Sequence, residues 1–187
     1  MFLDEEQIIK SLVDTKSALE RYIKIMEMFR KVDVSTNYKF QASFIGFYNI
    51  QHSKFKEFCS GYFSFMEKHK NSVPSFIDTL RYLYKFGRLE ISFSSKLLAT
   101  IDPGQPVWDR YILKFFNLKK PPRKRVYGSE MRIAHGNDAY EKLKQKYKAF
   151  IATDESKRWI QLFDMYFPIC DITPIKKIDF IICKNWI

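Results

Sequence analysis

Lys96 and Asp109 are the residues of this chain whose types and spacing best suit a covalent reaction. Lys96 stands one turn into a predicted helix, Asp109 opens the next helix, and a rigid Asp-Pro-Gly turn at residues 102–104 joins the two. Burial and neighbouring bases lower the pKa of a lysine, and the neutral amine can then attack C1′ of a sugar and form a Schiff base. An aspartate at a helix N-terminus stays ionised and can stabilise an oxocarbenium-like sugar. The pattern predicts that both side chains reach the rim of one site.

Each of these residues also has a purely structural interpretation. Asp109 can simply cap the helix that follows it, and Lys96 can be an ordinary solvated helix residue. Trp108 is either a core anchor, which is favoured, or a ring that stacks on an extruded base. Lys176, Lys177 and Asp179 lie on the last predicted helix, where the two bases can pair with Asp109 or with phosphate, although a plain surface role is favoured.

The spacing of apolar residues predicts helices along the whole chain. Apolar side chains recur mostly every three or four positions between only six glycines and seven prolines, and no pair of strands stands out. Helices are expected over residues 4–33, as two within 36–70 that meet near 51–53, over 74–87, from a cap at Ser92 or Ser94 to 101, from 106–109 to 116, and over 137–152, 154–167 and 174–181. We therefore expect a single all-α domain over residues 1–187, with a cleft between the hairpin of Lys96 and Asp109 and the aromatic N-terminal helices.

Positive charge is concentrated in the second half of the chain. Lys and Arg exceed Asp and Glu by 11 overall, and residues 110–158 alone hold 14 bases against five acids, whereas residues 1–33 hold six bases and seven acids. Two prolines among five bases predict an exposed basic loop within residues 118–136. Such a patch binds phosphates with an affinity that falls steeply with salt, so we expect nucleic-acid contacts from Arg110, Lys119, Lys120, Arg123, Lys124, Arg125 and Arg132. The loop can instead be a disordered or partner-binding element.

The segment around the lysine and the aspartate resembles a known family, the helix-hairpin-helix DNA glycosylase superfamily. The resemblance lies in two runs, Ser92-Phe93-Ser94-Ser95-Lys96-Leu97-Leu98 and Val107-Trp108-Asp109-Arg110-Tyr111-Ile112. It implies a glycosylase-like fold in which Lys96 is the Schiff-base nucleophile of bifunctional members and Asp109 is the catalytic carboxylate. The family's hairpin turn contains glycines that meet a DNA phosphate, whereas residues 89–94 contain none. Together with residues 175–179, the same segment is also similar to a set of small uncharacterised bacterial proteins, which implies no activity.

Other features of the sequence bear on the cellular compartment, on membrane contact and on cofactors. Three widely spaced cysteines without a CxxC pair indicate a reducing compartment, and an acidic start that lacks the pattern of a signal peptide favours the cytoplasm. No apolar run approaches the length of a membrane span, and we expect no membrane contact. The chain lacks the common phosphate-loop, dinucleotide, hydrolase, zinc-protease and EF-hand motifs, so no cofactor or metal is expected. A monomer is the default expectation.

These observations lead to three hypotheses about function. The first is a DNA-binding protein of the base-excision type, an N-glycosylase or AP lyase, in which the basic loop and Arg110 hold the backbone and Lys96 and Asp109 act on a flipped nucleotide. DNA is favoured over RNA. The second is a non-catalytic nucleic-acid-binding or regulatory protein on the same scaffold, which the missing hairpin glycines favour. The third is a protein-interaction module whose basic face meets an acidic partner.

Overall fold

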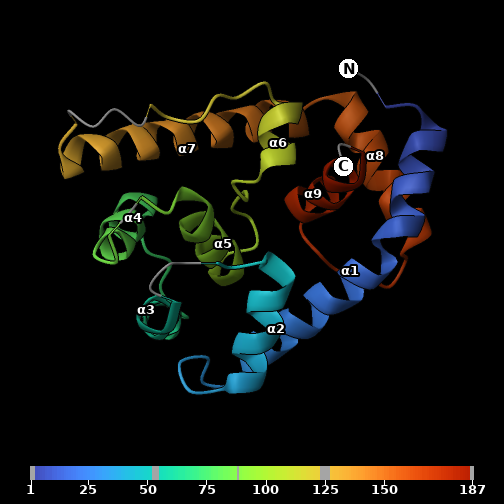
Figure 1. Ribbon diagram of the computed structural model, residues 1–187. Coiled ribbons are helices and arrows are strands. Elements are labelled where there is room, and N and C mark those ends of the chain that lie inside the picture. The colour runs from blue at the N-terminus through green and yellow to red at the C-terminus, as the bar shows by residue number, and fades with distance from the viewer. Residues whose placement is uncertain (1–2, 52–54, 88, 123–126, 186–187) are drawn as a thin grey trace.

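The computed structural model describes residues 3–51, 55–87, 89–122 and 127–185. Within these ranges the chain is all-α and contains no strand, which confirms the fold class that the apolar spacing predicts. No helix in them is long and apolar enough to cross a membrane. The described elements are arranged as Figure 1 shows: α1 (Glu5–Lys31), α2 (Tyr38–Tyr48), α3 (Phe55–Lys68), α4 (Phe76–Tyr84), α5 (Ile91–Ile101), α6 (Arg110–Phe115), α7 (Ser129–Ile151), α8 (Asp154–Tyr166) and α9 (Pro174–Asn185).

Short polar side chains set the starts of several helices. Asp4 forms a capping box at α1, because its side chain accepts from the backbone N–H of Gln7 at 2.8 Å while the Gln7 side chain accepts from the backbone N–H of Asp4 at 3.1 Å. Ser75, Thr153 and Asp109 cap α4, α8 and α6, because the side chain of each accepts a hydrogen bond from a backbone N–H in the first turn of its helix. The predicted starts of these four helices are therefore accurate to within a few residues.

Helix α5 lies at the centre of the packing, between α3 and α4 on one side and α6 and α9 on the other (Figure 1). Every residue from Phe93 to Thr100 is buried. Phe93 and Leu97 belong to an aromatic-rich core with residues of α1 to α4 and the segments between them, and Leu98 and Ala99 belong to a second core with residues of α1, α4 and α6 to α9. Lys96 therefore lies on a helix that both cores hold in place.

The beginning of α5 differs from the prediction. The helix starts at Ile91, so Ser92 and Ser94 lie inside it, and neither is its cap. The N-cap residue is Glu90, which makes no capping hydrogen bond with its side chain. The extra turn is possible because Ile91 is itself buried in the core, and tertiary packing stabilises a start that no capping residue marks.

The basic loop is shorter than predicted, because α7 begins at Ser129 rather than at residue 137. Residues 129–136 are helical, and Arg132 lies on the helix. The sequence does not predict this part of the helix, because glycine, here Gly136, is unfavourable in the interior of a helix. The glycine is buried, and a Cβ there would lie 3.2 Å from Leu89 Cδ2, so its small size allows α7 to approach the α4–α5 connection closely. The predicted contacts Arg123, Lys124 and Arg125 lie outside the described residues.

Candidate functional site

The connection from α5 to α6 is held by hydrogen bonds that fix the position of Asp109. The Asp102 side chain accepts from the backbone N–H of Gly104 at 2.9 Å and from Gln105 Nε2 at 2.8 Å, which makes the predicted rigid turn. Further along, the backbone N–H of Trp108 donates to Ser95 Oγ at 2.8 Å. Because Ser95 directly precedes Lys96, this bond links the lysine-bearing helix to the residue before the aspartate.

Lys96 and Asp109 line one cavity of about 320 Å³, which we call the lysine pocket. It lies between α1, the end of α2, α5, residues 107–112 and α9, with charged lining residues Arg21, Lys96, Asp109, Lys176, Asp179 and Lys184. This is a cavity between the predicted hairpin and the aromatic N-terminal helices, where the sequence predicts a cleft. Residues of α9 also line this cavity, although the sequence favours a surface role for the bases of that helix.

The Lys96 amine is buried in the lysine pocket, with the residue 8% exposed. Its Nζ donates to the backbone carbonyl of Tyr48 at 3.0 Å and lies 5.6 Å and 5.4 Å from the ring centroids of Tyr48 and Phe93. Burial lowers the pKa of Lys96, and the nearby charge of Asp109 offsets part of this effect. The interpretation of Lys96 as a solvated helix residue is therefore wrong.

Asp109 is half-buried and caps α6, since Asp109 Oδ1 accepts from the backbone N–H of Tyr111 at 2.9 Å. The structural interpretation of this residue is thus confirmed. Capping also fixes the carboxylate, and the same residue lines both the lysine pocket and a second cavity described below. A carboxylate held in this way can stabilise positive charge that develops on a ligand in either cavity.

Lys176 and Asp179 form a buried polar network with a residue that is distant in the sequence, Tyr147, beside the lysine pocket. Lys176 Nζ and Asp179 Oδ2 are 3.0 Å apart on α9, and Tyr147 on α7 donates its hydroxyl to Asp179 Oδ1. Burial raises the pKa of Asp179, while the Lys176 charge and the Tyr147 hydrogen bond act in the opposite direction. The favoured surface role for Lys176 and Asp179 is therefore wrong.

The spacing of polar residues on α9 is the sequence feature that could have indicated this network. Lys176, Asp179 and Cys183 follow one another at spacings of three and four, so they share one face of α9 and all line the lysine pocket. Polar side chains on the inward side of an apolar helix usually need partners. Tyr147 was not identifiable as that partner, because it lies 32 positions away in the chain.

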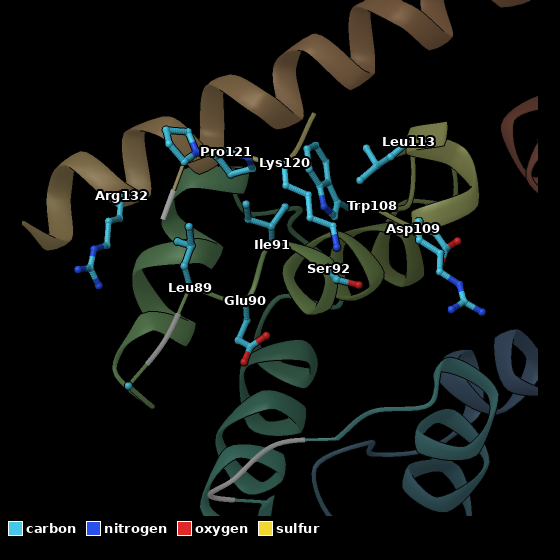
Figure 2. A pocket seen from close by; sticks show the side chains of 13 residues that line it. Leu89, Glu90, Ile91, Ser92, Trp108, Asp109, Leu113, Lys120, Pro121 and Arg132 are labelled. Carbon is cyan, nitrogen blue, oxygen red and sulfur yellow. The ribbon is translucent and has the colours of Figure 1, made fainter. Parts of the chain in front are cut away.

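A second cavity, of about 590 Å³, brings together three of the predicted nucleic-acid contacts, and we call it the basic cavity. Arg110 at the start of α6, Lys120 in the following loop and Arg132 on α7 line it, together with the carboxylates of Glu90 and Asp109. Figure 2 shows the Lys120 side chain extending past Trp108 toward Ser92, whereas Arg132 projects from α7 away from Trp108. Lys119 is exposed and is not among the lining residues.

Trp108 borders the basic cavity but belongs to the core. The residue is 5% exposed and packs in the core that α6 to α9 share. The favoured interpretation of Trp108 as a core anchor is confirmed. Its stacking on an extruded base stays a prediction.

Comparison with known proteins gives no relative from which a role can be transferred. No protein-family model, no curated protein and no solved structure matches this chain. Among the described residues, no group of three or more His, Cys, Asp or Glu side chains is placed to hold a metal ion.

Proposed function

We propose that the protein binds DNA and acts as an N-glycosylase and AP lyase on one extruded nucleotide. The observation that carries this proposal is that a buried lysine and a fixed carboxylate, Lys96 and Asp109, line the same pocket. A lysine whose pKa is lowered by burial supplies a larger fraction of neutral, nucleophilic amine at a given pH. The pocket volume of about 320 Å³ falls at the lower end of the range for small-ligand sites.

The proposed reaction begins when the neutral Lys96 amine leaves the Tyr48 carbonyl and attacks C1′ of the deoxyribose. The bond between C1′ and the base nitrogen breaks, its electron pair leaves with the base, and the base takes up a proton. Loss of a proton from the attached amine and transfer of a proton to O4′ then open the sugar ring and give a protonated Schiff base between Lys96 and C1′. The Asp109 carboxylate stabilises the positive charge that develops at C1′ while the base leaves.

The basic cavity supplies the binding half of the proposal. Arg110, Lys120 and Arg132 come from three separate elements and line a single cavity that shares Asp109 with the lysine pocket. Cations in such a cavity bind the phosphate backbone without reading its sequence. A strand held there lies next to the pocket where the reaction is proposed to occur.

Borohydride trapping tests this function directly. Purified protein is incubated with duplexes that carry an abasic site or an oxidised or deaminated base, and borohydride reduces any Schiff base to a stable covalent adduct. We expect an adduct that is lost in Lys96→Met, which keeps the aliphatic stem, and that forms about 100-fold more slowly in Asp109→Asn. Lys114→Met, at an exposed lysine of α6, is the matched control and should trap normally. Trapping that persists in a folded Lys96→Met variant overturns the assignment.

A non-catalytic nucleic-acid-binding protein is the second candidate, and two features of the hairpin favour it. The start of α5 has no turn glycine, and the Glu90 carboxylate lines the basic cavity among the cations. In this case the duplexes show a salt-dependent mobility shift, with neither base release nor an adduct. Absence of binding even at low salt contradicts both candidates and leaves the protein-interaction module.

A further inference from the structure

Two cations of the lysine pocket, Arg21 on α1 and Lys184 on α9, have no role in the proposed reaction. Within the described residues neither forms an ion pair, whereas Lys176 in the same pocket is paired with Asp179. Arg21 is exposed and Lys184 is half-buried, so both lie nearer to solvent than Lys176, whose side chain is 4% exposed. Once the buried pair is set aside, Asp109 is the remaining carboxylate that the described lining places against Arg21, Lys96 and Lys184. The pocket therefore has an excess of positive charge toward its opening.

Aromatic rings form the apolar wall beside these cations. The Arg21 guanidinium lies 5.8 Å from the centroid of the Phe47 ring, which restricts its position. Tyr22 meets Phe180 edge to face at 5.8 Å and lies 6.2 Å from Phe47, and all three aromatic residues line the pocket. Such a wall suits the apolar faces of a sugar and a base, while the cations suit an anionic group attached to them.

We propose that the lysine pocket binds a single nucleotide and that Arg21 and Lys184 hold its phosphate. The ligand class is a phosphate carried on a deoxyribose, with the sugar and base against the aromatic wall and C1′ facing Lys96. This inference rests on the proposed function, because it names the residues that recognise the nucleotide on which Lys96 acts. It adds two elements, α1 and α9, that the basic cavity does not use.

The test compares the affinities of dUMP and deoxyuridine, which differ only in the phosphate, by calorimetric titration at low salt. We expect dUMP to bind at least about tenfold more tightly, and Arg21→Gln or Lys184→Gln each to weaken dUMP binding about tenfold while leaving deoxyuridine binding unchanged. Arg30→Gln is the matched control, since Arg30 is an exposed arginine of α1 that does not line the pocket. Equal affinity for the two probes, no binding of dUMP, or equal effects of Arg21→Gln and Arg30→Gln overturns the inference.

A competition experiment distinguishes the two sources of such a phosphate. Displacement of dUMP by an abasic duplex assigns the site to a nucleotide within DNA, and dUMP binding that survives the duplex assigns it to a free nucleotide. Because titration requires no covalent step, its result is independent of trapping. Phosphate-dependent dUMP binding without a Lys96 adduct supports this inference and contradicts the proposed function, and an adduct without phosphate dependence does the reverse.

Discussion

The lysine pocket and the basic cavity share Asp109 but differ in how deeply their charged side chains are buried. In the lysine pocket, Lys96 and the Lys176–Asp179 pair are buried. In the basic cavity, Arg110 and Lys120 are exposed, and Arg132 is half-buried on α7. The two cavities are therefore suited to different tasks. Desolvation changes the protonation of the buried groups in the lysine pocket, whereas the exposed cations of the basic cavity only attract an anion.

This contrast has energetic consequences. Buried charges interact strongly and depend on their partners, so removing one member of a pair leaves the other uncompensated. Exposed charges are screened over about 8 Å at physiological ionic strength, and their effects decline with salt. Substitutions of the buried groups Lys96, Lys176 and Asp179 should therefore change stability and reactivity, whereas substitutions of the cations Arg110, Lys120 and Arg132 should change salt-dependent affinity.

The largest expected effect is on stability, at the buried pair. We expect Asp179→Ala to lower the free energy of unfolding by about 3–5 kcal/mol, because Lys176 is left as an unpaired buried charge. The double variant Lys176→Met/Asp179→Leu should recover most of this loss. Urea unfolding followed by circular dichroism measures both.

The matched control for the buried pair is an exposed one of the same spacing. Lys157 and Asp154 on α8 are also three positions apart, with side chains 60% and 98% exposed. Asp154→Ala should cost less than about 1 kcal/mol. If Asp179→Ala costs no more than Asp154→Ala, the buried network does not stabilise the fold as we describe.

A smaller effect is expected in the basic cavity. Lys120→Ala and Arg132→Ala should each weaken duplex binding to a similar extent for all sequences, and each should reduce the slope of log affinity against log salt by about 1. Lys146→Ala, at an exposed lysine of α7 outside the cavity, should leave the slope unchanged. Fluorescence anisotropy at a series of salt concentrations measures these slopes. Equal slopes for Arg132→Ala and Lys146→Ala would show that the cavity does not contact phosphate.

The smallest expected effect is a change in the pH dependence of Lys96. Only the neutral amine reacts with acetic anhydride, so labelling of Lys96 should rise with pH, with a midpoint below that of the same lysine in the urea-unfolded chain, because burial lowers its pKa. Asp109→Asn should move the midpoint further down, since the carboxylate favours the charged amine. Mass spectrometry of the labelled peptide gives the midpoint, and a shift upward in Asp109→Asn contradicts the described electrostatics.

The same pKa shift makes the stability contributed by Lys96 depend on pH. Its folded pKa lies below the unfolded value, so the unfolded chain binds more protons in the window between the two. Stability due to this residue should therefore rise as pH rises through that window.

The sequence was sufficient for the fold class and for much of the helix pattern, because these depend on local apolar spacing and caps such as Asp4 and Asp109. It was insufficient where tertiary packing overrides local preference. Gly136 conceals the first two turns of α7, although its small size is what permits the close approach of that helix. Likewise the sequence favours a surface role for Lys176 and Asp179, because the Tyr147 hydroxyl that completes their network comes from another helix.

Identification of the residue that carries the trapped sugar tests the role of Lys96 most directly. An adduct formed with an abasic duplex and reduced by borohydride is digested, and the modified peptide is sequenced by mass spectrometry. We expect the modification on Lys96, with none on Lys176 or Lys184 of the same pocket. Modification of either of those lysines, or of an exposed lysine of the basic cavity, would contradict it.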